Sequence, residues 1–434
     1  MKLRCLLVNP WIYDFAAYNF WARPLGLLKV AEFLTQFNVE LFFIDCCDAF
    51  REKKFGTGKY HCQVVEKPDI IKNIPRKYKR YGVLLDEFIA KIKEIKEIDI
   101  IFVTSIMTYW YPGVKKTVEI LREYFKNALL ILGGIYATLY KEHAEKNIGA
   151  DFIYCGQLSD ELINILDNFG FKLKKVKQKP QYWWQLGFYK KMSYAPLLTS
   201  TGCVFRCPYC ASSLLHKEFK QRNIDEVFYE ISELYRIGVR DFAFYDDALL
   251  FKAETHIKPL LKRVVNNSLK INFHTPNGLH ARFIDEETAF LMKESGFKTI
   301  RLSLETVNIE RQVKTGGKVT NEELQKAVFF LKKVGFSPQQ IGVYLMYGLP
   351  EQSFEEVREG VNFLKNLKVR IHLTEFSPIK GTYYWSELVK KGVILDDLDP
   401  IFTNNTIFSE LYSGYSREEI EALKLEVNRY NLLI

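Results

Sequence analysis

The 434-residue sequence has no long hydrophobic run. No stretch approaches the roughly 18–20 uncharged apolar residues of a membrane-spanning helix. Low-complexity tracts and short-period repeats are also missing. The opening segment MKLRCLLVNPWIYD has too short an apolar run, and becomes acidic too soon, for a signal peptide. We therefore expect a cytoplasmic protein without a membrane span.

The cysteine pattern does not suit a disulfide framework, which is typical of small secreted domains. The chain has eight cysteines, and three of them fall within eight residues. In a reducing compartment, clustered cysteines more often bind metal or carry out redox chemistry. The eight are Cys5, Cys46, Cys47, Cys62, Cys155, Cys203, Cys207 and Cys210.

Composition and charge exclude a generally disordered chain, because 48% of residues are apolar and 26% are charged. The net charge is +9, and one basic run, from Lys72 to Arg80, contains no acidic residue. Such runs can bind polyanions, but a solvated surface is the simpler interpretation. No nucleic-acid motif accompanies the run, so we expect no nucleic-acid partner.

Residues 1–165 alternate apolar strand patterns with helical patterns. This alternation predicts a doubly wound parallel sheet of the Rossmann type. Ligands bind such sheets at the carboxyl ends of the strands. Strands are predicted at 3–9, 39–45, 98–105, 128–134 and 150–156, and helices at 25–36 and 114–125. A basic and then aromatic segment, 166–195, is predicted to be a linker whose aromatic residues serve in packing.

A second alternation begins at Pro196. Six predicted strands with five helical crossovers resemble a TIM-type barrel that stops two units short of eight. The sequence thus predicts a partial (β/α)6 barrel over 196–380, with a lateral opening for a large substrate, and a helical extension over 381–434. The strands are expected at 197–201, 239–247, 269–275, 297–306, 339–348 and 369–377, and the helices at 223–237, 255–267, 285–295, 321–334 and 354–367.

Residues 201–210, TGCVFRCPYC, follow the first barrel strand and carry three cysteines, Cys203, Cys207 and Cys210. Iron–sulfur cubanes are held by thiolates, and four irons normally take four ligands. Three cysteines in one loop leave one iron open to bind a substrate directly. A zinc site that uses His216 as a fourth ligand is the alternative, but zinc motifs usually come as two ligand pairs. Barrel active sites lie at the carboxyl ends of the strands, which favours the [4Fe–4S] cluster.

The cysteine pattern, with Tyr209 before the last cysteine, resembles the signature of the radical S-adenosylmethionine (SAM) superfamily. Later segments resemble that family in the same order along the chain. They are FYDDALL (244–250), PNGLHAR (276–282), RLSLET (301–306), YLMYGLPEQSFEE (344–356) and EFSPIKGT (375–382). The resemblance implies that the open iron is chelated by the amino and carboxylate groups of SAM.

The same resemblance implies a set of SAM-binding residues. Ser303 and Glu305 would offer a hydroxyl and a carboxylate to the ribose or the ammonium group. Lys314 would pair with the SAM carboxylate, and Gly348 would let the backbone approach the adenine. Asp246 and Asp247 would bind the amino group or the substrate, although one of them is also suited to capping a helix. The expected SAM-binding residues are Tyr209, Asp246, Asp247, Ser303, Glu305, Lys314 and Gly348.

The N-terminal region is similar to that of the radical SAM subclass with a cobalamin (B12)-binding domain. The segments that carry the similarity are RPLGLLKVAEFL (23–34), 105–108, LGGIYATL (132–139) and ADFIYCGQ (150–157). Glycines at strand ends would leave room for the nucleotide tail of the cofactor. The expected cobalamin-binding residues are Ser105, Met107, Thr108, Gly133, Gly134, Tyr136 and Gly156.

One departure concerns the Asp-x-His-x-x-Gly motif, whose histidine ligates cobalt in many cobalamin domains. Here the segment after the first strand reads NPWIYDFAAY, and the first histidine is His61. We therefore expect cobalamin to bind without a histidine ligand; the alternative is a domain that only contributes to substrate binding. Trp11, Tyr13 and Arg23 are candidates for covering the lower face of the cobalt. Methylthiotransferases, a competing relative, need a second cluster on three N-terminal cysteines, and Cys5, Cys46 and Cys47 are not spaced for one.

The sequence thus predicts a radical SAM enzyme that cleaves SAM to a 5′-deoxyadenosyl radical, and a cobalamin-dependent methyltransferase acting on an unactivated carbon. One alternative is a rearrangement, cyclisation or oxidation without methyl transfer. Another is a non-catalytic iron–sulfur or zinc-binding module. The expected partners are a small-molecule or peptide substrate and an electron donor such as flavodoxin or ferredoxin. The substrate itself is not readable from the sequence.

Overall fold

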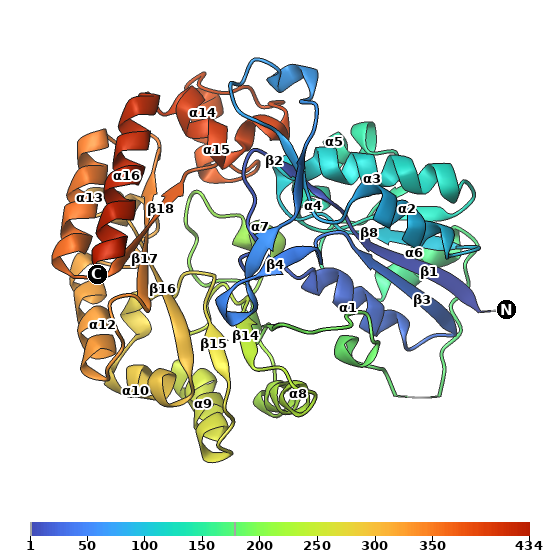
Figure 1. The fold of residues 1–434 in the computed structure, drawn as a ribbon, viewed down its shortest axis with the longest axis horizontal. Coiled ribbons are helices and arrows are strands. Elements are labelled where there is room, and N and C mark those ends of the chain that lie inside the picture. Colours follow the sequence, from blue (N-terminus) through green and yellow to red (C-terminus); the bar gives the residue numbers. More distant parts are fainter. Residues whose placement is uncertain (1, 178) are drawn as a thin grey trace. The chain divides into compact units, whose positions relative to one another are not determined.

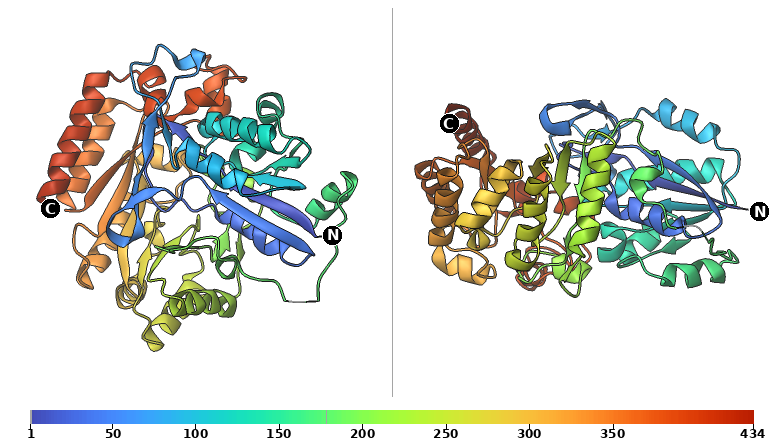
Figure 2. Two further views of the ribbon diagram at one scale, coloured as in Figure 1. Left: turned by 45° about the vertical axis from the view of Figure 1, so that its right-hand side comes forward. Right: turned by 90° about the horizontal axis from the view of Figure 1, so that it is seen from below.

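A computed structural model describes residues 2–177 and 179–434. The chain divides into two compact units, Met1–Lys191 and Met192–Ile434. Figures 1 and 2 show that each unit is a layered arrangement of strands and helices. No helix in the described residues is long and apolar enough to cross a membrane.

The first unit is built on a five-stranded parallel sheet with the strand order β10-β9-β8-β1-β3. The chain forms β3 on one side of β1 and then crosses to β8 on the other side. This switch point lies between the carboxyl ends of β1 and β8, where open α/β sheets bind ligands. The strands are β1 (Leu3–Asn9), β3 (Val39–Asp45), β8 (Ile100–Val103), β9 (Leu129–Leu132) and β10 (Phe152–Ile153).

Helices cover both faces of this sheet. Apolar residues of α1 and α6 pack with alternate strand residues, such as Cys5, Leu7 and Phe102, in one core. Successive strand side chains point to opposite faces, so Leu6 and Val8 face the side where Figure 1 shows α2 and α3. The helices are α1 (Leu25–Leu34), α2 (Leu85–Lys93), α3 (Tyr111–Tyr124), α4 (Ile135–Leu139), α5 (Lys141–Asn147) and α6 (Glu161–Asn168).

Two additions to the first unit were not predicted. One is a pair of small antiparallel sheets, β2-β7-β6 and β4-β5, in which β2 precedes α1 and the other strands lie between β3 and α2. The strands are β2 (Ile12–Asp14), β4 (Phe50–Glu52), β5 (Gly58–Tyr60), β6 (Cys62–Val64) and β7 (Lys79–Tyr81). In this region Arg80, from the basic run, is buried, and it donates to Gln63 Oε1 at 2.7 Å. The other addition is the segment 166–191, which belongs to the first unit. Trp183 and Trp184 are buried there, as the packing role predicted for these aromatic residues requires.

The second unit has a six-stranded parallel sheet in the sequential order β11-β14-β15-β16-β17-β18, as the repeat of the sequence predicted. Phe242, Phe244, Phe273 and Phe297 are buried and their rings contact one another, and the rings of Phe244 and Phe297 are stacked. The strands are β11 (Ala195–Leu197), β14 (Asp241–Phe244), β15 (Asn272–His274), β16 (Phe297–Glu305), β17 (Ile341–Tyr347) and β18 (Arg370–Glu375).

The crossover helices α8, α10, α12 and α13 begin at N-cap side chains that the sequence provides. Asn223, Asp285, Thr320 and Ser353 each accept a hydrogen bond from a backbone N–H of the first turn of their helix. The C-terminal α16 packs beside α13 and against β18 (Figure 1). The helices are α7 (Ser212–Leu215), α8 (Ile224–Arg236), α9 (Ile257–Asn266), α10 (Glu286–Glu294), α11 (Ile309–Lys314), α12 (Asn321–Lys333), α13 (Phe354–Asn366), α14 (Tyr383–Lys390), α15 (Asn405–Tyr412) and α16 (Arg417–Leu433).

Candidate functional site

The cysteine loop leaves the carboxyl end of the first barrel strand, as predicted. A short antiparallel hairpin of β12 (Ser200–Thr201) and β13 (Lys220–Gln221) closes the loop at its base. Asp246, at the end of β14, is buried and accepts hydrogen bonds from the backbone N–H and hydroxyl groups of both Thr199 and Ser200. Its carboxylate therefore fixes the start of the loop, a structural role of the kind that the sequence left open for one of the two aspartates beside a SAM or substrate contact.

The three cysteine side chains are free thiols of intermediate burial. Burial raises the pKa of each thiol, and the positive charge of Lys318 acts in the opposite direction at all three. The backbone N–H of Ser212 points to Cys210 Sγ at 3.4 Å. Gly316, with φ +102°, lies against Cys207. A Cβ at position 316 would lie 3.3 Å from the Cys207 Sγ atom. This glycine keeps one side of Cys207 clear of side-chain atoms.

Aromatic contacts fix the remainder of the loop. Phe205 packs on the buried His280 with ring centroids 4.7 Å apart. The backbone N–H of Tyr384, in α14, donates to the carbonyl of Pro208 at 2.9 Å. These contacts use residues of the PNGLHAR segment and of the C-terminal extension, so both segments help to position the cysteines.

A buried ion pair lies beside the cysteines. Lys318 Nζ contacts Glu305 Oε1, and the two side chains are only 13% and 6% exposed. Burial acts to lower the pKa of Lys318, but Glu305 and Cys207 outweigh it, so the pKa is raised and the amine stays charged. The amine also lies 5.6 Å from the ring centroid of Tyr209. Lys314, the lysine expected to pair with the SAM carboxylate, is exposed on α11, and Lys318 was not singled out from the sequence.

The other predicted SAM-binding residues have varied surroundings. Ser303 is buried, and its hydroxyl lies directly against Gly278, where a Cβ would be 1.9 Å away. Asp247 accepts a hydrogen bond from Ser212 Oγ at 2.6 Å. Gly348 has φ +79°, and the position of its missing Cβ faces Ser409 of α15 at 3.4 Å. Tyr209 has a buried hydroxyl, and its pKa is raised by burial and by the nearby charge of Glu305.

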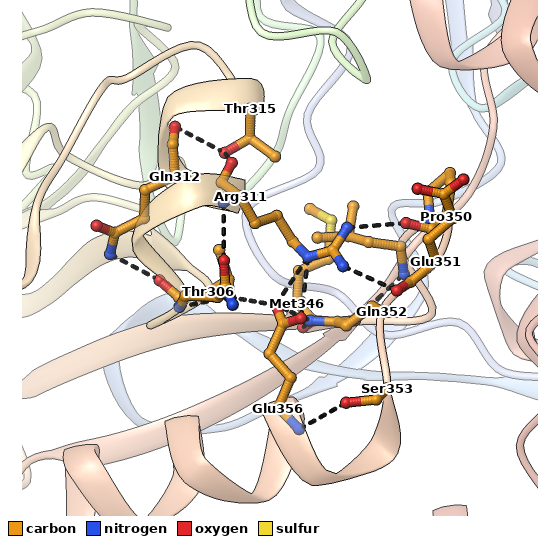
Figure 3. Close-up of polar contacts among 12 residues, drawn as sticks. Thr306, Arg311, Gln312, Thr315, Met346, Pro350, Glu351, Gln352, Ser353 and Glu356 are labelled. Carbon is orange, nitrogen blue, oxygen red and sulfur yellow. Dashed lines mark hydrogen bonds and ion pairs between the residues drawn. The ribbon is translucent and has the colours of Figure 1, made fainter.

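A polar network anchors the Gly-Leu-Pro segment to the end of β16 (Figure 3). Arg311 donates to the Glu356 carboxylate at 2.8 Å and to the carbonyls of Pro350 and Glu351. Thr306 also contacts Glu356. This network fixes the loop after β17 relative to the loop after β16, where the resemblance places the SAM contacts.

The zinc alternative requires four ligands within about 2.0–2.3 Å of one ion. In the described part of the chain, no three His, Cys, Asp and Glu side chains converge on the position of a single metal ion. A [4Fe–4S] cluster does not require such convergence, because each cysteine binds a different iron. The histidine beside a cluster cysteine is His280, whose Nε2 lies 4.0 Å from Cys203 Sγ. Burial, together with the charges of Lys318 and Arg282, lowers the pKa of His280 to about 3, so the ring is neutral.

In the first unit, the predicted cobalamin-binding residues lie at adjacent strand ends. Ser105 Oγ donates to the carbonyl of Gly133 at 2.7 Å, and Ile135 N–H donates to the carbonyl of Ser105 at 2.8 Å. A Cβ at Gly134 would lie 2.1 Å from that same Ser105 carbonyl, so the loop requires this glycine for close backbone approach. Gly156 is open, with no atom within 4 Å of its Cβ position, and its N–H donates to Thr138 Oγ1 at 3.0 Å.

Three further side chains were expected near the cofactor. Met107 is 44% exposed and Thr108 is partly exposed. Tyr136 is fully buried instead, and its hydroxyl is hydrogen-bonded to His143 Nδ1 at 2.7 Å. Of the candidates for the lower face of the cobalt, Trp11 is buried and donates to the carbonyl of Val83, and Arg23 is buried over the Tyr189 ring. Both therefore contribute to the interior of the first unit, whereas Tyr13 lies in β2.

Comparison with known proteins agrees with this division. Residues 197–364 match the Radical SAM superfamily, and residues 71–166 match the B12 binding domain. The second unit thus contains a radical SAM domain, and a B12-binding domain precedes it. The chain has the domain arrangement of radical SAM enzymes with an N-terminal cobalamin-binding domain.

An uncharacterized methyltransferase, PH0819 of Pyrococcus horikoshii, is 26% identical over 235 residues. That alignment covers 52% of this chain and 50% of the relative, so the chain spans about half the length of that relative. The structure of the radical SAM methyltransferase TsrM from Kitasatospora setae, with cobalamin and a [4Fe–4S] cluster bound, superimposes with a TM-score of 0.65 and 16% identity. The superposition covers 90% of this chain and 75% of TsrM.

The cobalamin-dependent radical SAM enzyme OxsB superimposes with a TM-score of 0.56 and 14% identity. Here 92% of this chain and 56% of OxsB are covered. Similarity at these identities shows a shared fold. The predicted fold class, with a doubly wound sheet, a partial barrel and a helical C-terminus, is confirmed.

A radical SAM domain implies a [4Fe–4S] cluster and SAM, and a B12-binding domain implies cobalamin. The residues present fit these groups. Three thiols on one loop supply the soft ligands that iron–sulfur clusters take. Gly316 leaves Cys207 uncovered, and Gly133 and Gly156 leave open backbone at the carboxyl edge of the first sheet.

The buried pair of Lys318 and Glu305 provides a stability prediction. Lys318→Met leaves the Glu305 carboxylate buried without its cation, which we expect to lower the free energy of unfolding by roughly 3 kcal/mol. Urea denaturation of the anaerobic protein measures this change. The double variant Lys318→Met with Glu305→Gln should recover most of the loss, and equal losses in both variants would contradict a charge-pairing role.

Iron content provides a second prediction, because only the three loop cysteines are expected to bind a cluster. Cys5 lies within β1, and the buried Cys46 and Cys47 are adjacent, so their spacing does not gather three thiolates in one loop. Anaerobically reconstituted protein should carry about four irons per chain, the content of one cubane. Iron at roughly eight per chain would indicate a second cluster.

Proposed function

We propose that the protein is a cobalamin-dependent radical SAM methyltransferase that acts on an unactivated carbon. The observation that carries the proposal is the pairing of a three-cysteine loop at the mouth of a partial barrel with a preceding B12-binding domain. The methyltransferase names of PH0819 and TsrM support it. The substrate class at this level is a small molecule or a peptide, and the electron donor is a flavodoxin or ferredoxin in the cytoplasm.

When bound, the cluster supplies the electron that cleaves SAM to a 5′-deoxyadenosyl radical, and cobalamin supplies the methyl group. Cys203, Cys207 and Cys210 would hold the cluster. Asp246 fixes the two residues that precede the loop, and Lys318 offsets negative charge beside the thiolates. The buried surroundings of Glu305 and Ser303 exclude water from the inner side of the mouth.

SAM binding in this proposal uses the mouth residues Tyr209, Asp247, Ser303, Glu305 and Gly348, with Lys318 in the position first assigned to Lys314. Glu305 already has a cationic partner, so it would accept a hydrogen bond from a ribose hydroxyl with its second oxygen. In the first unit, Ser105, Gly133, Gly134 and Gly156 would shape the edge that receives the cofactor tail.

The experiment supplies SAM with a trideuteromethyl group, a reductant and cell extract to the anaerobic, cobalamin-loaded protein. Mass spectrometry should find a product that carries the deuterated methyl group, together with S-adenosylhomocysteine. Formation of 5′-deoxyadenosine alone, with an unlabelled rearranged or oxidised product, would contradict methyl transfer. It would favour the alternative radical reactions.

A further inference from the structure

The last three barrel strands carry a group of cationic and polar side chains on one face. Parallel register places Arg301 beside Gly342 and Arg370, and places Tyr344 beside His372 one step further along. The opposite face of β17 packs on α13. A Cβ at Gly360 of that helix would lie 2.7 Å from the Leu345 side chain. Since strand side chains alternate, the cationic group lies on the inner face of the barrel.

Gly342 lets two of these side chains converge. A Cβ at this position would lie 2.7 Å from His372 Nε2 and 2.9 Å from Arg301 Nη1. Both nitrogens therefore approach one point above β17, where the chain has no side chain. The Tyr344 ring borders this point, with its centroid 5.6 Å from that of His372, and its hydroxyl donates across to the carbonyl of Pro276 at 2.8 Å.

No acidic residue balances the two arginines. Within residues 2–177 and 179–434, neither Arg301 nor Arg370 takes part in an ion pair. Arg301 Nη1 donates to the carbonyl of Ile300, and the Arg301 side chain is also hydrogen-bonded to Tyr344. The Nε of Arg370 and the Nε2 of His372 are buried without a hydrogen-bond partner. Burial and the charge of Arg370 lower the pKa of Arg301, and burial together with both arginines lowers the pKa of His372 to about 3.

Buried donors and like charges without partners are costly, and a ligand of opposite charge removes that cost. Arginine matches carboxylate and phosphate oxygens with paired N–H donors. We infer that Arg301, Arg370 and His372 form a binding site for an oxyanion, a carboxylate or phosphate group of the substrate. The assignment of the anion to the substrate rests on the proposed function, whereas the anion site itself does not.

The position in the barrel fits this assignment. Arg301 precedes Glu305 by four residues on β16, which corresponds to roughly 13 Å along the strand. The anion would lie deep in the barrel while the carbon to be methylated lies near the mouth. The site would therefore select substrates by a charged group several bonds away from the reacting carbon.

Calorimetric titration of the full-length, cluster-reconstituted protein in chloride-free buffer of constant ionic strength tests the site directly. The probes are inorganic phosphate and acetate, whose separate isotherms distinguish the two oxyanions. We expect saturable binding of at least one probe, weakened about tenfold or more by Arg301→Gln and by Arg370→Gln. Gly342→Ala keeps both charges but fills the point of convergence, and should weaken binding to a similar extent.

The control is Arg429→Gln, which removes one exposed charge of α16 and should change affinity by less than about twofold. Unchanged circular dichroism and iron content establish that the variants fold. Absence of binding for both probes, or equal weakening in the control, would overturn the inference. Neither readout requires methyl transfer, so failure of the proposed function and failure of the anion site are distinguishable.

Discussion

Replacement of any one of Cys203, Cys207 and Cys210 by alanine is expected to abolish reductive cleavage of SAM. With two thiolates the cluster lacks a ligand set that leaves a single open iron, and the electron transfer that cleaves SAM requires SAM on that iron. The measurement is 5′-deoxyadenosine formation by anaerobically reconstituted protein with SAM and a chemical reductant. The expected reduction exceeds about a hundredfold, comparable with removal of an essential catalytic group.

Cys62→Ala is a matched control, because Cys62 is an exposed free cysteine in the first unit. Its activity should equal that of the wild-type protein. If SAM cleavage persists in all three loop variants, the assignment of the cluster to these cysteines is wrong.

Protein supplied with hydroxocobalamin should retain the cofactor through gel filtration, with a base-off absorption spectrum, and Gly134→Trp should lose it. Gly134 has φ +100°, and a side chain there would collide with the Ser105 carbonyl. The substitution therefore displaces the strand-end loop and takes up the room expected for the nucleotide tail of the cofactor. SAM cleavage should remain largely intact, because the second unit has its own core.

Gly149→Ala is a control that separates the effect of the collision at Gly134 from the effect of backbone strain alone. Gly149 also has a positive φ, +76°, but no atom lies within 4 Å of its Cβ position. This variant should retain cobalamin. If the wild-type protein retains none at micromolar concentration, the methyltransferase proposal fails and a cobalamin-independent radical reaction replaces it.

The fold was largely predictable because its signals are local. The strand patterns at 3–9 and 39–45 coincide with β1 and β3, since each contains an apolar run, CLLV or LFFI, that is bounded by polar residues. Predicted strands near the ligand edge were too long. β9 ends at Leu132 and β10 at Ile153, because the following residues leave the ladder to form the loops of that edge. The two small antiparallel sheets of the first unit were missed because three-residue strands carry no periodicity.

The site was predictable only in part. Cysteine spacing identifies the cluster loop, since all three ligands lie within one local segment. The roles of Asp246 and Lys318 depend on contacts between distant segments, Asp246 with Thr199 and Lys318 with Glu305. Lys314 and Lys318 are equally plausible in the sequence, and only the turn at Gly316 and Gly317 determines which amine reaches the mouth. That glycine pair after α11 was the available signal.

The most direct test of the account measures both SAM products in one reaction. Anaerobic protein carrying its cluster and cobalamin is incubated with SAM, reductant and a substrate-containing extract, and 5′-deoxyadenosine and S-adenosylhomocysteine are quantified. The account predicts that both form, that loss of the cluster cysteines removes 5′-deoxyadenosine, and that omission of cobalamin removes S-adenosylhomocysteine. Formation of neither product by protein with about four irons per chain would contradict a radical SAM methyltransferase.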